Sequence, residues 1–236
     1  MGRAYEVRKA SIQKTGAARG KIYSMYAREI YEVAKNGGTE LESNVALKRL
    51  VDKAKKEQVP SDIIKRAIDK VNSGADESYS TVRYELFGPS GSNVIVDCLT
   101  DNVNRSVSLI RAALNKTSAK MGAMGSVAFM YDNLCIVSFK GLSEEETLEA
   151  LIEAGVDADI ELQGDSIVLY GKPSDLYAIK EAILAKKQVE FDVDEISMIP
   201  KDTVKLEGEA LEDFQKLLTL LDEIEDVNHV YHNVEL

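Results

Sequence analysis

The clearest alternation of apolar and polar positions lies within residues 80–131. Val82, Tyr84 and Leu86 alternate with polar neighbours, residues 94–99 form a short β-branched run, and Gly-Pro-Ser-Gly stands between the two. Turn residues between two strand-like runs are typical of a β-hairpin. We therefore expect two antiparallel strands here, followed by a helix and a third strand.

The helix is indicated by a different period. Asp101 or Asn102 can cap its start, and the apolar positions after them recur at spacings of four, three and four, which is one stripe of an amphipathic helix. These positions are Val103, Val107, Ile110 and Leu114. Three strands with one helix cannot cover their own apolar face. The missing parts are expected after residue 200, as a strand near 203–206, a helix near 209–221 and a strand near 227–231.

Within residues 134–198, about 65 residues, the apolar positions change several times between strand-like and helical spacing. The patterns predict strand, helix, strand, strand, helix, strand in that order. The ranges are 135–139, 143–154, 160–162, 167–170, 173–185 and 190–199. This order is that of the ferredoxin-like split βαβ unit. Ser143 followed by Glu146 predicts a capping box at the start of its first helix.

Three helices are expected before residue 75. The first runs from Ile22 to the Gly37-Gly38 pair, the second covers about 43–58, and the third starts near Pro60 and stops at Gly74. Tyr23 and Tyr26 in the first helix could stack on bases. Aromatic residues at helical spacing are more often part of a core, so we expect them to be packed inside.

Together these elements predict an α+β protein with an N-terminal three-helix domain followed by two α/β domains. Residues 1–75 form the basic helical domain with an N-terminal arm, and the polar, turn-rich residues 72–81 are its linker. The middle α/β domain is discontinuous and combines residues 80–132 with 200–236. The ferredoxin-like domain, residues 133–199, is inserted into it.

Charge divides the chain unevenly. Residues 1–70 hold 16 Lys and Arg against 9 Asp and Glu, a net charge of +7, whereas the remaining residues hold 13 against 31, a net charge of −18. Such asymmetry is expected when one part of a chain meets a polyanion and the rest repels it. Lys-rich helix surfaces also occur without any nucleic-acid partner, so charge alone leaves both interpretations open.

No catalytic constellation is recognisable, and we expect neither enzymatic activity nor a cofactor nor a metal ion. His229 and His232 stand three apart in a predicted strand and point to opposite faces. The chain lacks the spacing of a phosphate-binding loop. Cys98 and Cys135 fall in apolar runs and are expected to be buried thiols. With no apolar run of membrane-spanning length and no signal peptide, we expect a cytoplasmic monomer without membrane contact.

Several motifs resemble the YebC/PmpR family of probable transcriptional regulatory proteins, which includes a mitochondrial translational activator of cytochrome oxidase. They are GPSGS, LTDNVNRSVSLIRAALNK, MGAMGSVAFMYD, VPSDIIKRAIDKVNSG, EISMIP and VYHNVEL. The usual family start has His-Ser-Lys-Trp-Ala-Asn, which is absent here, and this chain has no Trp. It is therefore more similar to the YeeN-like branch. The resemblance covers almost the whole chain and implies the same three-domain arrangement.

The resemblance implies DNA-binding transcriptional regulation, with a ribosome-associated translation factor or translational activator that binds ribosomal RNA as the alternative. Promoter DNA and ribosomal RNA are both polyanions, and the basic N-terminal part is expected to contact either. The candidate residues are Arg3, Arg8, Lys9, Lys14, Arg19, Lys21, Arg28, Lys48, Arg49, Lys53 and Lys56.

The segment from Met121 to Met130 contains two glycines, Gly122 and Gly125. A loop with soft apolar tips could contact RNA or protein. An ordinary long connection is the alternative that we favour, with its methionines tucked under the sheet.

Overall fold

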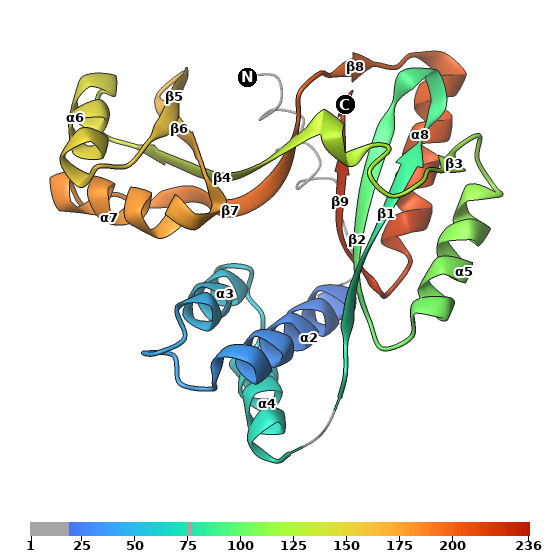
Figure 1. The fold of residues 1–236 in the computed structure, drawn as a ribbon, viewed down its shortest axis with the longest axis horizontal. Coiled ribbons are helices and arrows are strands. Elements are labelled where there is room, and N and C mark those ends of the chain that lie inside the picture. The colour runs from blue at the N-terminus through green and yellow to red at the C-terminus, as the bar shows by residue number, and fades with distance from the viewer. Residues whose placement is uncertain (1–18, 75–76) are drawn as a thin grey trace. The chain divides into compact units, whose positions relative to one another are not determined.

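The computed structural model describes residues 19–74 and 77–236 (Figure 1). Its described residues divide into two compact units. The larger unit contains residues 19–74, 77–127 and 206–232, and the ferredoxin-like unit contains residues 128–205 and 233–236. The chain therefore leaves the larger unit after residue 127 and returns to it at residue 206.

The helical part of the larger unit consists of α2 (Arg19–Gly37), α3 (Val45–Lys56) and α4 (Ser61–Asn72). Asn44 fixes the turn between the first two, because its side chain accepts from the Leu47 N–H and donates to the carbonyl oxygens of Val33 and Gly38. A Cβ atom at position 37 would lie 2.6 Å from Asn44 Nδ2, so any residue larger than glycine there would displace the Asn44 side chain. The helices enclose one apolar cluster of buried residues, which are Tyr26, Ile30, Ala34, Leu47, Val51, Ala54, Val59, Ile64 and Ala67.

The sheet of the larger unit has the strand order β3-β1-β2-β9, and all of its pairs are antiparallel. Its elements are β1 (Ser80–Phe87), the 3₁₀ turn η1 (Pro89–Gly91), β2 (Asn93–Thr100), α5 (Val103–Leu114), β3 (Lys120–Met121), α8 (Gly208–Asp222) and β9 (Val227–His232). Helices α5 and α8 lie side by side on one face (Figure 1). Ile110, Phe214 and Leu217 are fully buried there. A helix and a strand from the C-terminal part thus complete the sheet.

Two details of the larger unit differ from the apolar patterns. Val103 was expected on the buried stripe of α5, but it is 42% exposed. Ser106 is buried instead, because its hydroxyl donates to the carboxylate of Asp226 at 2.7 Å. A polar residue replaces an apolar one on this face because its hydrogen-bond partner comes from a distant part of the chain.

The loop from β3 to residue 127 is held by a buried carboxylate. Glu85 of β1 accepts from the N–H groups of Gly125 at 2.6 Å and Val127 at 2.5 Å, and its carbonyl oxygen accepts from Gly122 N at 2.7 Å. Met124, at the tip of this loop, is 95% exposed. The expectation that the methionines tuck under the sheet is therefore wrong for Met124.

The ferredoxin-like unit contains an antiparallel sheet of order β5-β6-β4-β7. Its elements are the 3₁₀ turn η2 (Ala128–Met130), β4 (Tyr131–Lys140), α6 (Glu144–Ala154), β5 (Ala158–Gln163), β6 (Ser166–Gly171), the 3₁₀ turn η3 (Pro173–Asp175), α7 (Leu176–Lys186) and β7 (Phe191–Pro200). The predicted capping box between Ser143 and Glu146 is present. The strand order and the two helices confirm the ferredoxin-like fold.

The strand expected near residue 203 does not join the sheet of the larger unit. It is β8 (Val204–Lys205), which pairs in parallel with β10 (Val234–Glu235). Two residues on each side suffice for this small ladder, and its partner strand lies at the end of the chain. The α+β fold class, with helices first and a ferredoxin-like α/β unit, is confirmed, whereas the discontinuous middle domain and the boundaries of the three domains remain predictions.

Candidate nucleic-acid interface

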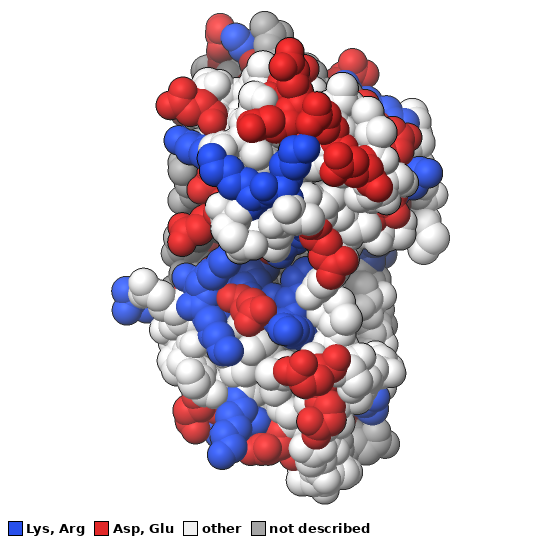
Figure 2. All heavy atoms as spheres, turned by 90° about the vertical axis from the view of Figure 1, so that its left-hand side faces the viewer, with Lys and Arg blue, Asp and Glu red and all other residues white. Residues whose placement is uncertain are grey.

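Helix α3 holds five Lys and Arg and one Asp among its 12 residues. Its apolar positions Leu47, Val51 and Ala54 are buried in the helical cluster, so the opposite side faces solvent. That side and its flanks hold Lys48, Arg49, Lys53, Lys55 and Lys56. Figure 2 shows basic side chains grouped on this helical part, with acidic ones among them. Positive charge on a solvated helix face is suited to phosphate contacts.

The other predicted contact residues have different positions. Arg3, Arg8, Lys9 and Lys14 lie outside the described residues. Arg19 is exposed at the start of α2. Lys21 binds the carboxylate of Asp222 at 3.2 Å, and Arg28 is only 9% exposed. Lys21 and Arg28 thus hold α2 in place, and we leave them out of the interface.

Helix α2 is attached to residues 222–229 by polar contacts along its length. Ser24 Oγ donates to Glu225 at 3.0 Å, and Glu29 accepts from Asn228 Nδ2 at 2.8 Å. His229 Nε2 lies 3.3 Å from the same carboxylate. The partners in each of these pairs are about 200 residues apart in sequence, so local periodicity carries no signal for this attachment.

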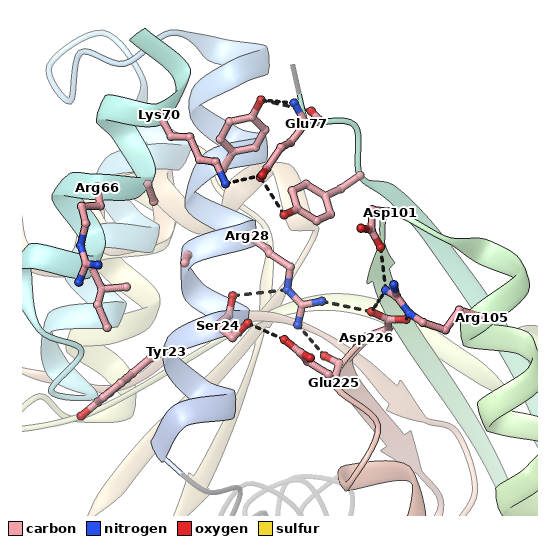
Figure 3. A pocket seen from close by; sticks show the side chains of 15 residues that line it. Tyr23, Ser24, Arg28, Arg66, Lys70, Glu77, Asp101, Arg105, Glu225 and Asp226 are labelled. Atoms are coloured by element: carbon pink, nitrogen blue, oxygen red, sulfur yellow. Dashed lines mark hydrogen bonds and ion pairs between the residues drawn. The ribbon is translucent and has the colours of Figure 1, made fainter. Parts of the chain in front are cut away.

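Asp226 is the centre of the attachment (Figure 3). Its carboxylate is almost fully buried and accepts hydrogen bonds from Arg105 at 2.7 and 3.1 Å, Ser106 at 2.7 Å and Thr100 at 3.1 Å. Arg28 Nη1 approaches it at 3.4 Å. The Arg28 guanidinium also donates to the carbonyl oxygens of Leu99 and Glu225. A buried carboxylate with this many donors is stabilised in its charged form.

The pKa values of the two carboxyl groups in this attachment, Asp226 and Glu29, follow from these contacts. Burial alone would raise the pKa of Asp226, but the hydrogen bonds from Arg105, Ser106 and Thr100 outweigh burial and hold that pKa below its usual value. Burial also opposes ionisation of Glu29, yet the partners His229 and Asn228 lower its pKa on balance. Both carboxylates are therefore charged in the folded protein around neutral pH.

A pH dependence of stability is the first expected result. A carboxyl group with a lowered folded pKa stabilises the fold above its unfolded pKa, about 3.9 for Asp, and this contribution is lost as pH falls through the folded value. Thermal melting from pH 7 to pH 2 should show a steep loss of stability below about pH 4. Asp226→Asn should show a shallower slope in that window, and equal slopes for both proteins would contradict this account.

A cleft of about 890 Å³ opens between α2 and α4 on one side and residues around Arg105 and Asp226 on the other (Figure 3). Its lining residues are Tyr23, Ser24, Ala27, Arg28, Tyr31, Ile63, Arg66, Ala67, Lys70, Glu77, Tyr79, Asp101, Arg105, Glu225 and Asp226. Four cationic side chains, four carboxylates and three tyrosines therefore meet in one place.

Part of the predicted linker forms an end of this cleft. The Tyr31 hydroxyl donates to the carbonyl oxygen of Glu77 at 3.2 Å and accepts from its N–H at 3.0 Å, and the Glu77 carboxylate pairs with Lys70. Burial and the neighbouring Glu77 carboxylate raise the pKa of Tyr79 to about 12. Residues 77–79 are thus bound to the helical part.

Two family descriptions match this chain. Residues 3–74 match the TACO1/YebC protein N-terminal domain, and residues 79–234 match the TACO1/YebC second and third domain. The chain belongs to the TACO1/YebC family. The matches cover almost the full length and confirm the family that the sequence motifs indicated.

Relatives within the family have a common description. A "probable transcriptional regulatory protein" of Marinobacter nauticus is 47% identical over 100% of this chain and 99% of its own length, and one of Vibrio parahaemolyticus is 46% identical over the full length of both. The crystal structure of a conserved hypothetical protein from Aquifex aeolicus is also similar, with a TM-score of 0.77 and 33% identity over 94% of this chain and 93% of that one.

Within residues 19–74 and 77–236, no three His, Cys, Asp or Glu side chains lie close enough together to hold a metal ion. His232 is buried edge-on against Phe214, and His229 lies beside Glu29. None of the described helices is long and apolar enough to span a bilayer. Cys98 and Cys135 are buried, as expected.

Proposed function

We propose that this protein is a DNA-binding transcriptional regulatory protein that acts without catalysis. The observation that carries the proposal is the basic face of α3, presented on a helical part with its own apolar core. The description shared by the relatives supports it. Lysine and arginine side chains neutralise phosphates and release counterions, which supplies most of the affinity of such an interface.

The strongly acidic remainder of the chain supports an oriented encounter. Residues 71–236 carry 31 acidic against 13 basic side chains, so a polyanion is repelled from them and attracted to the helical part. The partner is therefore expected to approach through the basic face of α3.

Ribosomal RNA is the alternative partner, for a specific reason. The fully exposed basic side chains on α3 are lysines, which bind phosphate and position a nucleic acid without reading its bases. Such a surface suits the phosphate backbone of ribosomal RNA as well as that of a promoter. A ribosome-associated translation factor would use the same residues.

The test compares two triple variants with equal charge change. Lys48, Lys55 and Lys56 are exposed on α3, and Lys140, Lys172 and Lys216 are exposed in the acidic part. Changing the α3 set to Gln should weaken nucleic-acid binding by about tenfold or more. The salt slope should become shallower by roughly one unit for each phosphate that the variant no longer neutralises.

The control set should leave affinity and slope nearly unchanged. Equal losses of affinity in both variants, measured by fluorescence anisotropy across a salt series, would show that the charge on α3 is only a solvated surface. For a promoter partner, one fragment should be preferred over scrambled DNA by about a thousandfold at physiological salt. For a ribosomal partner, duplex binding should be unselective while the protein co-sediments with ribosomes.

A further inference from the structure

We propose that the cleft between α4 and Arg105 holds a single unpaired nucleotide of the bound nucleic acid. This inference rests on the proposed function, because it requires a nucleic-acid partner on α3. It goes further in specifying the form of that partner, which would have a base outside its helical stack.

The size and the walls of the cleft suit one nucleotide. A volume of about 890 Å³ is within the range of about 300–1,000 Å³ typical of small-molecule sites. Its lining includes the apolar Ala27, Ile63 and Ala67 and the aromatic Tyr23 and Tyr79. Aromatic and apolar side chains of this kind accept a base without regard to its identity, because every base has a π face.

Two arginines line the cleft from different helices, and each presents a guanidinium group to which a phosphate can bind (Figure 3). The side chain of Arg66 on α4 is 71% exposed and that of Arg105 on α5 is 46% exposed. Among the described residues, Nη1 of each guanidinium group donates to no protein acceptor, since their bonds use Nε and Nη2 only. A planar guanidinium group with a free edge is the side chain best matched to phosphate geometry.

Arg66 can turn to a ligand at little cost. Its partner Asp62 lies one turn away on the same helix, and both side chains are more than two-thirds exposed. Exposed pairs of this kind contribute little to stability. Arg105, in contrast, is anchored through Nε and Nη2 to Asp226 and Asp101, so its free Nη1 has a fixed position.

The charge balance of the cleft favours a single nucleotide over a duplex backbone. Its four cationic side chains are matched by four carboxylates, Glu77, Asp101, Glu225 and Asp226. A surface without net charge does not attract a run of phosphates, but it can take one base and one phosphate while the lysines of α3 bind the rest of the strand. Helix α4 packs against α3, so the two sites lie on the same helical part.

The experiment uses two hairpins of equal length and charge, one fully paired and one with a single unpaired 2-aminopurine. Each is made as RNA and as DNA, so that the two sources of the nucleotide are compared. The full-length protein should bind the hairpin with the unpaired base about tenfold tighter than the paired one, and stacking should quench the 2-aminopurine fluorescence. The chain contains no Trp to interfere with this signal.

Lys65→Gln is the matched control for Arg66→Gln, because both residues are exposed neighbours on α4 and only Arg66 lines the cleft. Arg66→Gln should remove the preference for the unpaired base and the quenching. Lys65→Gln should retain both. Circular dichroism of both variants verifies that the fold is unchanged.

Failure of this inference differs from failure of the proposed function. Equal affinity for the paired and unpaired hairpins, with a normal salt slope, would overturn the cleft as a nucleotide site and leave the proposed function standing. The same holds if Lys65→Gln and Arg66→Gln reduce the preference equally. Absence of salt-dependent binding to every hairpin would overturn both.

Discussion

Replacing Asp226 with Ala should lower the free energy of unfolding of the larger unit by about 3–5 kcal/mol. The carboxylate is buried and accepts from Arg105, Ser106 and Thr100, and it faces the buried Arg28 guanidinium. Its removal leaves a buried cation without its countercharge and the buried Thr100 hydroxyl without its acceptor. Breaking a buried pair from one side is costly for this reason.

The measurement is urea unfolding followed by far-UV circular dichroism. Asp62→Ala is the matched control, because Asp62 pairs with Arg66 one helical turn away on the surface; this change should cost no more than about 0.5 kcal/mol. A midpoint for Asp226→Ala within the error of the control would mean that the buried network does not hold the helical part to the sheet.

The hydrogen bonds of Asp226 also fix the positions of side chains that line the cleft. Arg28 belongs to α2, Arg105 to α5, and Asp226 lies between α8 and β9, so one carboxylate connects the helices to the sheet. The same three side chains line the cleft. A variant that loosens this attachment should therefore alter nucleotide binding in the cleft, while the lysines on α3 still contact phosphates.

Local patterns were sufficient wherever the stabilising contacts are close in sequence. Three examples depend only on residues within a few positions of one another. They are the alternation of β1 through Leu86, the capping box at Ser143 and the end of α2 at Gly37-Gly38. These patterns predicted α2–α8 and the four strands of the ferredoxin-like sheet. Residues 227–231 were recognised as a strand for the same reason, although their pairing with β2 is long-range.

The candidate site could be predicted only in part, because charge alone does not distinguish a phosphate contact from a structural ion pair. Arg28 and Lys48 are both basic residues on predicted helices, and the sequence predicts both as phosphate contacts. In the structure Arg28 is buried against Asp226, whereas Lys48 is exposed. The partner of Arg28 is 198 positions away. Val103 is exposed and Ser106 is buried for the same reason, since the carboxylate that binds Ser106 is distant in the chain.

Replacing Phe214 with Ala should lower the free energy of unfolding of the larger unit by about 3–5 kcal/mol. Phe214 lies on α8, is fully buried, and contacts the His232 ring edge-on with centroids 5.4 Å apart. Its removal leaves a cavity between α8 and the sheet, in a close-packed core that can relax only partly. Ile152→Ala is the control, because Ile152 is two-thirds exposed on α6 and should cost less than about 1 kcal/mol.

Amide hydrogen exchange tests where this loss of stability is felt, and with it the prediction that the middle domain is discontinuous. If residues 206–232 fold together with residues 80–127, Phe214→Ala should reduce protection in β1, β2 and β9 together, because these strands form one sheet over α8. Strands β4 to β7 should retain their protection, since their core contains Cys135, Val137 and Phe139 and no residue of α8. Loss of protection confined to α8 and β9 would instead show that the C-terminal segment is a separable tail, and the discontinuous domain would be wrong.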